Sequence, residues 1–323
     1  MSQREFELIR RLFRERVQAA DDLPVGIGDD GAVLRVEAGE LVWAIDTINA
    51  GVHFPTDAPA HAVGHRVLAV NLSDLVAMGA TARWALLSLS LDETPDEKWL
   101  EGFCAGFFEL AERAGVVLGG GDMTRGPLAA SVSLLGRAGQ AVVTRRGARL
   151  GDWLLVSGTL GDARAGLDIA LGDDHVINEH ERSLLARYLY PEPRLGLSEP
   201  LARYATSAID LSDGLCADLG HLLRESGVGA ELALDQLPLS PALRAHAAEE
   251  APELALAGGD DYEILCTAGP DQVEALESSA QAAGLTLQRI GRIVEQRGLQ
   301  IRNAEGERVS PPTGFSHFGE TDA

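Results

Sequence analysis

The chain has 323 residues, 46% of them hydrophobic, and a formal net charge of −22 at pH 7. This length predicts two domains, and the apolar fraction is sufficient for two cores. The negative field argues against a nucleic-acid-binding protein, which needs a basic surface against the phosphate backbone. The longest apolar runs fall short of the roughly 18 residues that a membrane-spanning helix needs.

The composition also limits how this chain could handle a nucleotide. Its one lysine is Lys98, and no lysine follows a Gly-rich loop. The P-loop and the protein-kinase fold both place a lysine against the phosphates, so ATP would have to be bound by another architecture. An acidic protein that binds phosphates needs cations, for which divalent metals are one source. Plain solubility is the alternative explanation of the acidity.

The N-terminal residues and the cysteines indicate the cellular compartment of the protein. MSQREFELIRRLF has charges on both sides of its apolar positions, which predicts an amphipathic helix rather than a signal peptide. Cys104, Cys216 and Cys266 are far apart and form no CxxC pair. Small buried thiols of this kind are typical of a reducing cytosol. We therefore expect a cytoplasmic protein.

The first half of the chain alternates strand and helix patterns. Residues 41–46 (LVWAID) predict a buried strand that carries Asp46 at its end, and 60–78 predict a helix that stops at Gly79. A strand is predicted over 84–91. The next helix is expected to start from Thr94 as N-cap, with Pro95 and Glu97 behind it, and to run to Gly115. Strands over 116–122 and 131–138 follow.

The second half repeats the alternation after a polar, basic stretch. WLLVSG restarts the pattern, and helices are predicted over 213–226 and 270–283. LALDQ, YEILC and LTLQRIGRI predict strands, and residues 300–323 are expected to form a mobile tail. The alternation favours an α/β or α+β fold, with domains at 1–147 and 148–323.

Glycine and aspartate cluster in what the pattern indicates are turns or element ends. One such pair is more often a plain turn than a site. The clusters are Gly26-Ile27-Gly28-Asp29-Asp30, Asp46, Gly119-Gly120-Gly121-Asp122, Asp210-Leu211-Ser212-Asp213-Gly214 and Gly258-Gly259-Asp260-Asp261.

Two acids lie in strongly apolar surroundings. Asp74 falls within the predicted helix AVNLSDLVAMGA, and Asp46 ends an apolar strand. A buried carboxylate without compensation is unfavourable by several kcal/mol, about 2–7 on transfer scales for polar groups and more for charges. Because no cationic partner is near in sequence, metal ions are the natural compensation. Mg²⁺ prefers oxygen ligands and is commonly shared between carboxylates and substrate phosphates.

Other candidates have two interpretations each. Arg145, with Arg146 and Arg149, is either a clamp on ATP phosphates or a solvated interdomain linker. His53 is an acid/base residue, a substrate contact or a packed loop histidine. Phe315 and Phe318 either cover an aromatic ring or dock the tail.

Taken in order, the motifs resemble those of the thiamine-monophosphate kinase family, within the aminoimidazole-ribonucleotide-synthetase-like superfamily. AVNLSDLVAMGA and IDLSDGL are long and unusual, and the likeness spans nearly the whole chain. The matching stretches are GIGDDGAVL (26–34), AIDTINAGVHF (44–54), AVNLSDLVAMGA (69–80), GGGDMTRGPL (119–128), TRRGARLGDWLLVSGTLGDA (144–163), SAIDLSDGLCADLGH (207–221), AGGDDYEIL (257–265) and GFSHF (314–318).

The resemblance implies a two-domain fold, in which the N-terminal domain forms a homodimer and the C-terminal domain closes over the nucleotide. It implies ATP-dependent phosphorylation of thiamine monophosphate to thiamine diphosphate by direct in-line transfer, with several Mg²⁺ ions. The implied metal ligands are Asp30, Asp46, Asp74, Asp122, Asp210 and Asp213. The implied ATP contacts are Gly121, Asp122, Arg145 and Ser212. The implied substrate contacts are His53, Asp260 and Phe315.

Two positions depart from the family pattern. Asp260 stands where the family usually has Glu, and Ala44 and Ile45 stand where hydroxyl residues are usual before Asp46. A related enzyme that activates an amide or selenide is the alternative within the superfamily, and it usually carries a reactive Cys in an N-terminal Gly-rich loop. A non-enzymatic acidic metal binder is the other alternative, for which EF-hand loops would be expected.

Overall fold

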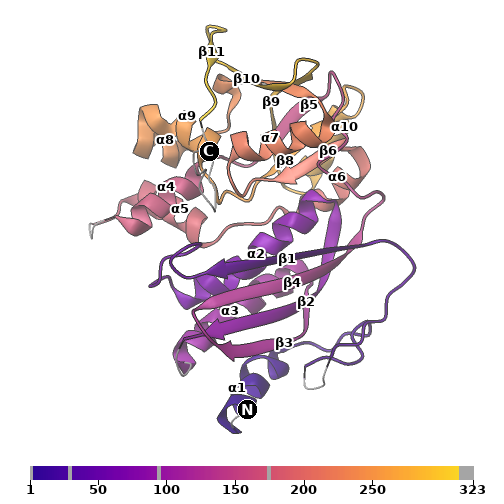
Figure 1. Cartoon of the computed structure of the whole chain (residues 1–323), viewed down its shortest axis with the longest axis vertical. Coiled ribbons are helices and arrows are strands. Elements are labelled where there is room, and N and C mark those ends of the chain that lie inside the picture. The colour runs from indigo at the N-terminus through magenta and orange to yellow at the C-terminus, as the bar shows by residue number, and fades with distance from the viewer. Residues whose placement is uncertain (1–2, 28–30, 93–95, 173–175, 313–323) are drawn as a thin grey trace, which may run out of the picture. The chain divides into compact units, whose positions relative to one another are not determined.

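The computed structural model describes residues 3–27, 31–92, 96–172 and 176–312. The chain forms two compact units, one of residues 1–75 and 81–138 and the other of residues 76–80 and 139–323. Both units combine helices with a β-sheet (Figure 1), so the predicted α/β (α+β) class is confirmed. Within the described ranges, no helix is both long and apolar enough to span a membrane.

The first unit is built on a four-stranded sheet in the order β1-β4-β2-β3. Strand β1 pairs antiparallel with β4, and β2 pairs parallel with β3. Helices α2 and α3 lie on one face of this sheet (Figure 1). In chain order the elements are α1 (Gln3–Leu12), a short 3-10 turn η1 (Arg14–Arg16), β1 (Leu41–Asn49), α2 (Ala60–Ala77), β2 (Ala80–Leu91), α3 (Glu97–Ala114), β3 (Val117–Arg125) and β4 (Ala129–Ala138).

The helix pair α2 and α3 packs with almost no side chain between the two backbones. A Cβ atom added at Gly64 would lie 1.9 Å from the carbonyl oxygen of Phe103, and one added at Gly106 would lie 1.9 Å from that of His61. Only glycine at both crossing points permits this approach. The close contact fixes α2, and with it Asp74, against the sheet.

The two faces of the first sheet differ in chemistry. Along β1, Val42 and Ile48 are buried on the helix side, whereas Trp43 and Ile45 on the other side are 74% and 66% exposed. Trp43 donates from its ring nitrogen to the Ser133 hydroxyl on β4 at 2.6 Å. Leu86 on β2 is also exposed. The open face is therefore partly apolar.

The second unit has a seven-stranded mixed sheet in the order β11-β10-β7-β9-β5-β8-β6. Among the described pairings of this second sheet, only that of β10 with β7 is parallel. The strands are β5 (Trp153–Ser157), β6 (Ser207–Asp210), β7 (Gly229–Ala233), β8 (Ile264–Ala268), β9 (Leu287–Val294), β10 (Gly298–Arg302) and β11 (Arg308–Val309). The helices are α4 (Asp162–Leu171), α5 (Glu179–Leu189), α6 (Ser198–Tyr204), α7 (Leu215–Ser226), α8 (Pro241–Ala247), α9 (Ala251–Ala257) and α10 (Val273–Ala282), with 3-10 turns η2 (Leu195–Leu197), η3 (Leu234–Gln236) and η4 (Ala248–Glu250).

Several predicted boundaries are wrong. The N-cap of α3 is Asp96, whose side chain accepts from the backbone N–H of Lys98, and not Thr94, which lies outside the described residues. The LALDQ strand stops at Ala233 and continues as η3. Residues 298–309 form β10 and β11 instead of a tail, because β10 completes a sheet edge beside β7.

Candidate active site

In the first unit, Asp46 and Asp74 meet on the helix side of the sheet. Asp46 comes from β1 and Asp74 from α2, and their side chains are hydrogen-bonded to each other. Burial raises the pKa of Asp46, against the opposing effects of that bond and of nearby His53. Two carboxyl groups in contact can bond only through a shared proton or a shared cation. This pair is therefore an acidic site that favours a bound cation.

Asn71 holds the two elements of this acidic site together. Its side-chain oxygen accepts from the backbone N–H of Asp46 at 3.0 Å, and its amide donates to the carbonyl of Val67 at 3.0 Å. Asn71 is fully buried. Asn71, one helical turn before Asp74, therefore fixes β1 against α2.

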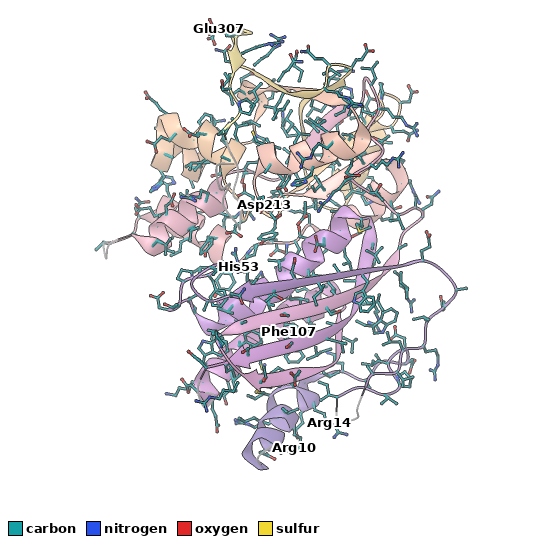
Figure 2. The ribbon with its side chains drawn as sticks, viewed as in Figure 1. Arg10, Arg14, His53, Phe107, Asp213 and Glu307 are labelled. Carbon is teal, nitrogen blue, oxygen red and sulfur yellow. The ribbon has the colours of Figure 1, made fainter. Side chains whose placement is uncertain are left out.

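His53 lies beside the end of β1 (Figure 2). Its Nδ1 accepts from the backbone N–H of Asn49 at 3.0 Å, and its own backbone N–H donates to the Asn49 carbonyl at 2.9 Å. The neutral ring consequently carries its proton on Nε2. The nearness of His53 lowers the pKa of Asp46, against the effect of burial. The structure therefore brings His53 together with the acidic pair.

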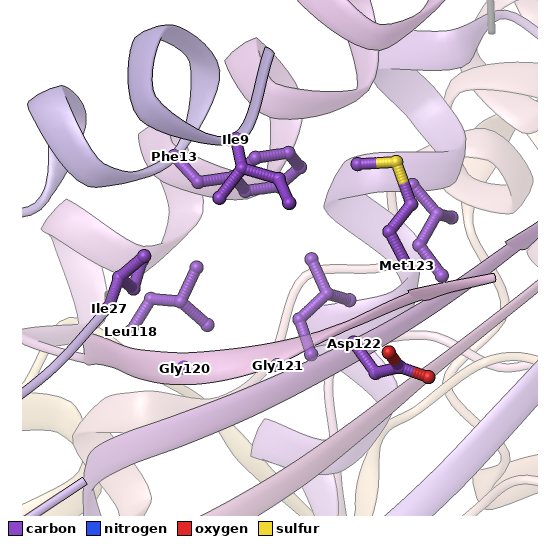
Figure 3. A pocket seen from close by; sticks show the side chains of 10 residues that line it. Ile9, Phe13, Ile27, Leu118, Gly120, Gly121, Asp122 and Met123 are labelled. Carbon is purple, nitrogen blue, oxygen red and sulfur yellow. The ribbon is translucent and has the colours of Figure 1, made fainter. Parts of the chain in front are cut away.

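Asp122 lies elsewhere in the same unit. Gly119 to Asp122 are part of β3, which was predicted over 116–122 but continues to Arg125, and a Cβ on Gly121 would lie 1.9 Å from the Leu87 carbonyl oxygen. Leu118 and Met123 point toward Ile9 of α1 and Phe13 just beyond it, across a small apolar cavity of about 70 Å³, while the carboxylate of Asp122 turns away (Figure 3).

The strand order separates Asp122 from the acidic pair. Strands β1 and β3 are opposite edges of the sheet with two strands between them. At about 4.8 Å per strand spacing, this places them roughly 14 Å apart. One Mg²⁺ ion cannot contact both Asp46 and Asp122 of the same chain.

In the second unit, three acids crowd around the start of α7. Asp210 ends β6, Asp213 follows it (Figure 2), and the buried Asp218 lies in the first turn of α7. Asp218 accepts from the backbone N–H of Asp213 at 3.0 Å. Burial and the charges of Asp210 and Asp213 raise the pKa of Asp218 to about 7, and Arg145 opposes them.

Asp218 was missed in the sequence, although IDLSDGLCAD has a third acid five residues after Asp213. Arg145 lies close enough to this acidic group to lower the pKa of Asp218. The hydrogen bonds of His53 to Asn49 also fit its interpretation as a packed loop histidine.

The loop of Asp210 to Asp213 is joined by backbone hydrogen bonds to the loop of Asp260. The Asp260 N–H donates to the Ser212 carbonyl and the Tyr262 N–H to the Leu211 carbonyl, both at 2.9 Å. The Leu211 N–H donates back to the Glu263 carbonyl at 2.8 Å. We call this arrangement the paired loops, residues 210–213 and 258–263. It brings the predicted residues Asp210, Ser212, Asp213 and Asp260 together.

The donors in both acidic regions suit Mg²⁺, because all are carboxylate oxygens. A cation beside either region would also relieve the burial and repulsion that raise the pKa values of Asp46 and Asp218. Among the residues that the structure describes, no group of three or more His, Cys, Asp or Glu side chains is arranged to hold a metal ion. Substrate phosphates commonly supply the remaining ligands of Mg²⁺. Asp30 and Phe315 lie outside the described residues.

The chain matches two domain families over most of its length. Residues 28–138 match the AIR synthase related protein, N-terminal domain, and residues 149–302 match the AIR synthase related protein, C-terminal domain.

Several relatives matched over nearly their full length are thiamine-monophosphate kinases. The thiamine-monophosphate kinase of Salmonella typhimurium (strain LT2) is 42% identical over 325 residues, covering 97% of this chain and 98% of that protein. The crystal structure of thiamine-monophosphate kinase from Stenotrophomonas maltophilia K279a superposes with a TM-score of 0.86 at 45% identity, covering 96% of this chain and 99% of that chain. A structure of AaThiL complexed with AMPPCP and TMP superposes with a TM-score of 0.80 at 33% identity, covering 98% and 99%.

Proposed function

The chain belongs to the thiamine-monophosphate kinase family, and on that premise we propose that it transfers the γ-phosphoryl group of ATP to thiamine monophosphate, forming thiamine diphosphate. The protein is a phosphotransferase. The solved structure of a similar protein, AaThiL, is complexed with AMPPCP and TMP. The observation that best supports the activity is the pair of loops, because it places the proposed phosphate-binding residues beside the proposed substrate residue Asp260.

The proposed phosphoryl transfer needs no strong general base from the protein. The attacking group is a phosphate oxygen of thiamine monophosphate, which is largely ionised near neutral pH because its second pKa is about 6. The difficulty is to bring two anions together in line. We propose direct transfer without a phosphoenzyme. Covalent label on the protein after incubation with γ-labelled ATP would overturn this.

The proposed roles follow the two acidic regions. Mg²⁺ would be held by Asp46 and Asp74, by Asp210 and Asp213, and by Asp122, with Asp30 as a further ligand; when bound, it neutralises phosphate charge. ATP would contact Gly121, Arg145 and Ser212. His53, Asp260 and Phe315 would bind the thiamine phosphate. The partly buried pair of Asp46 and Asp74 and the crowded acids around Asp218 support the metal assignment.

We further propose a homodimer formed through the first unit. Exposed apolar patches are typical of interaction surfaces, and Trp43, Ile45 and Leu86 expose such a patch on the open face of the sheet. Since Asp46 and Asp122 lie on opposite edge strands, they would hold different Mg²⁺ ions within one chain, or a shared ion between two chains.

The cysteines support a cytoplasmic location. Cys104 and Cys266 are buried, and burial raises the pKa values of both thiols to about 12 and that of Cys216 to about 11. Thiols with such high pKa values are unreactive and suit a reducing compartment.

The activity is tested by incubating the purified protein with ATP, Mg²⁺ and thiamine monophosphate and measuring thiamine diphosphate by chromatography. Thiamine is the matched acceptor control, since it lacks the nucleophilic phosphate. We expect product from thiamine monophosphate only, and none after EDTA treatment. Absence of thiamine diphosphate with Mg²⁺ present would refute the proposal.

The dimer predicts a specific effect of charge on the open face. In the double variant Trp43→Glu/Ile45→Glu, two carboxylates replace the apolar patch, and burying them against a second copy is unfavourable. We expect a monomer where the wild type is a dimer, measured by light scattering after size-exclusion chromatography. Leu171→Glu is the control, because Leu171 is also exposed but lies on α4 of the other unit. A dimeric double variant would exclude this face as the interface.

A further inference from the structure

The loop of residues 258–263 has an unusual backbone. Asp260 and Tyr262 have φ values of +70° and +48°, in the left-handed region. Bulky residues rarely adopt that conformation, and where they do, the strain is commonly associated with a functional site. The surrounding structure must therefore hold this loop in place.

Two buried carboxylates hold it. Asp261 is 3% exposed and accepts from the backbone N–H groups of Gly161 at 2.7 Å and Ala163 at 3.1 Å, at the start of α4. Glu263 is fully buried and accepts from the Ser157 hydroxyl at 2.6 Å.

Two arginines complete the second anchor. Arg187 donates to Glu263 at 2.7 Å, and Arg194 donates to it through both Nε, at 2.6 Å, and a terminal nitrogen. A forked contact of this kind fixes both position and orientation. Each strained residue is thus followed by a residue that is fastened to the body of the unit.

Side chains at positions 260 and 262 are consequently presented together. The Tyr262 hydroxyl donates to Oδ1 of Asp260 at 3.3 Å. Both residues are partly exposed, unlike the two anchors. This bond constrains the rotation of the Asp260 carboxylate before any ligand arrives.

We propose that Tyr262 is a positioning residue for thiamine monophosphate, which orients the Asp260 carboxylate on a loop preset by Asp261 and Glu263. The inference rests on the proposed function, in which Asp260 contacts the substrate. Thiamine carries a cationic thiazolium ring and an amino group, and both are recognised by a carboxylate. A carboxylate held in one orientation binds with less loss of rotational freedom.

A double-mutant cycle on Tyr262 and Asp260 tests the inference. Tyr262→Phe removes only the hydroxyl. Since 3.3 Å is long for an O–H···O bond, we expect a moderate increase in KM for thiamine monophosphate, about 3- to 10-fold, with kcat and KM for ATP within about twofold. In the Asp260→Ala background, Tyr262→Phe should have no further effect on KM. Tyr204→Phe, on α6 of the same unit, is the control and should behave as wild type.

The outcomes separate the two claims. If the wild type forms no thiamine diphosphate, the proposed function is refuted and the inference with it. If the wild type is active but KM is unchanged in Tyr262→Phe, only the inference is refuted. An increase that persists in the Asp260→Ala background, or one accompanied by an equal increase in KM for ATP, indicates a general structural role and also refutes it.

Discussion

Replacing Asp74 by Asn is expected to lower kcat by about 100- to 1,000-fold, the range seen when one electrostatic contact to a transition state is removed. The Mg²⁺ concentration needed for half-maximal activity should rise as well. Asn keeps the shape of the side chain but removes one of the two charges that meet between β1 and α2. The measurement is initial rate against Mg²⁺ concentration at saturating ATP and thiamine monophosphate.

Stability distinguishes loss of a metal ligand from loss of the fold. Burial already makes the charged form of Asp46 unfavourable, and an amide at position 74 can still donate to that carboxylate, so Asp74→Asn should leave the metal-free melting temperature unchanged or raise it. The stabilisation of the wild type by Mg²⁺ with ATP should be lost. Glu112→Gln, an exposed carboxylate on α3, is the matched control and should change neither measurement. Near-normal turnover in Asp74→Asn would remove Asp74 from the metal ligands.

Replacing Glu263 by Gln is expected to destabilise the second unit by about 3–5 kcal/mol, because it leaves buried charges without their partner. Burial lowers the pKa of Arg194, but the hydrogen bonds and charge of Glu263 outweigh it and raise the pKa overall. In the variant, Arg187 and Arg194 face a neutral amide that can accept at only one oxygen. Urea denaturation followed by circular dichroism measures the free energy of unfolding.

Glu277→Gln provides a control of the same chemistry in a different setting. Glu277 also accepts two bonds from one arginine, Arg289, both at 2.6 Å, but the two side chains are 29% and 30% exposed. Ion pairs at the surface contribute about 0–1 kcal/mol, so this variant should lose little stability. If Glu263→Gln lowers the free energy of unfolding as little as Glu277→Gln does, burial does not strengthen the contribution of the Glu263 contacts to stability.

The sequence patterns predicted helices well where interactions between neighbouring residues determine where a helix begins and ends. The helix expected over 60–78 is α2, and the helix ends at Gly115 and Gly227 are left-handed caps with φ of 67° and 72°. The start of α7 was predicted two residues early, because residues up to Gly214 turn back along the loop of Asp260. These hydrogen bonds join positions about fifty residues apart, and the periodicity of apolar residues along the sequence cannot predict such a pairing.

The same limit applies to the site. Asp46 and Asp74 were singled out because an acid in an apolar run is visible in a sequence. Glu263 was not, and Asp261 was noted only as part of a Gly-Asp cluster, since their partners at Arg194 and Gly161 come from distant segments. Asp122 was expected with the other acids, and only the strand order shows that β3 and β1 are opposite edges.

The paired loops also have a consequence for cooperativity. Three backbone hydrogen bonds join residues 211 and 212 to residues 260, 262 and 263, so neither loop can shift without the other. Suppose that ATP orders the first loop and thiamine monophosphate orders the second. The ligand that binds first then also orders part of the other loop, so the second ligand binds with a smaller loss of conformational entropy. Linkage then requires the coupling to be reciprocal: the factor by which ATP tightens thiamine monophosphate binding equals the factor by which thiamine monophosphate tightens ATP.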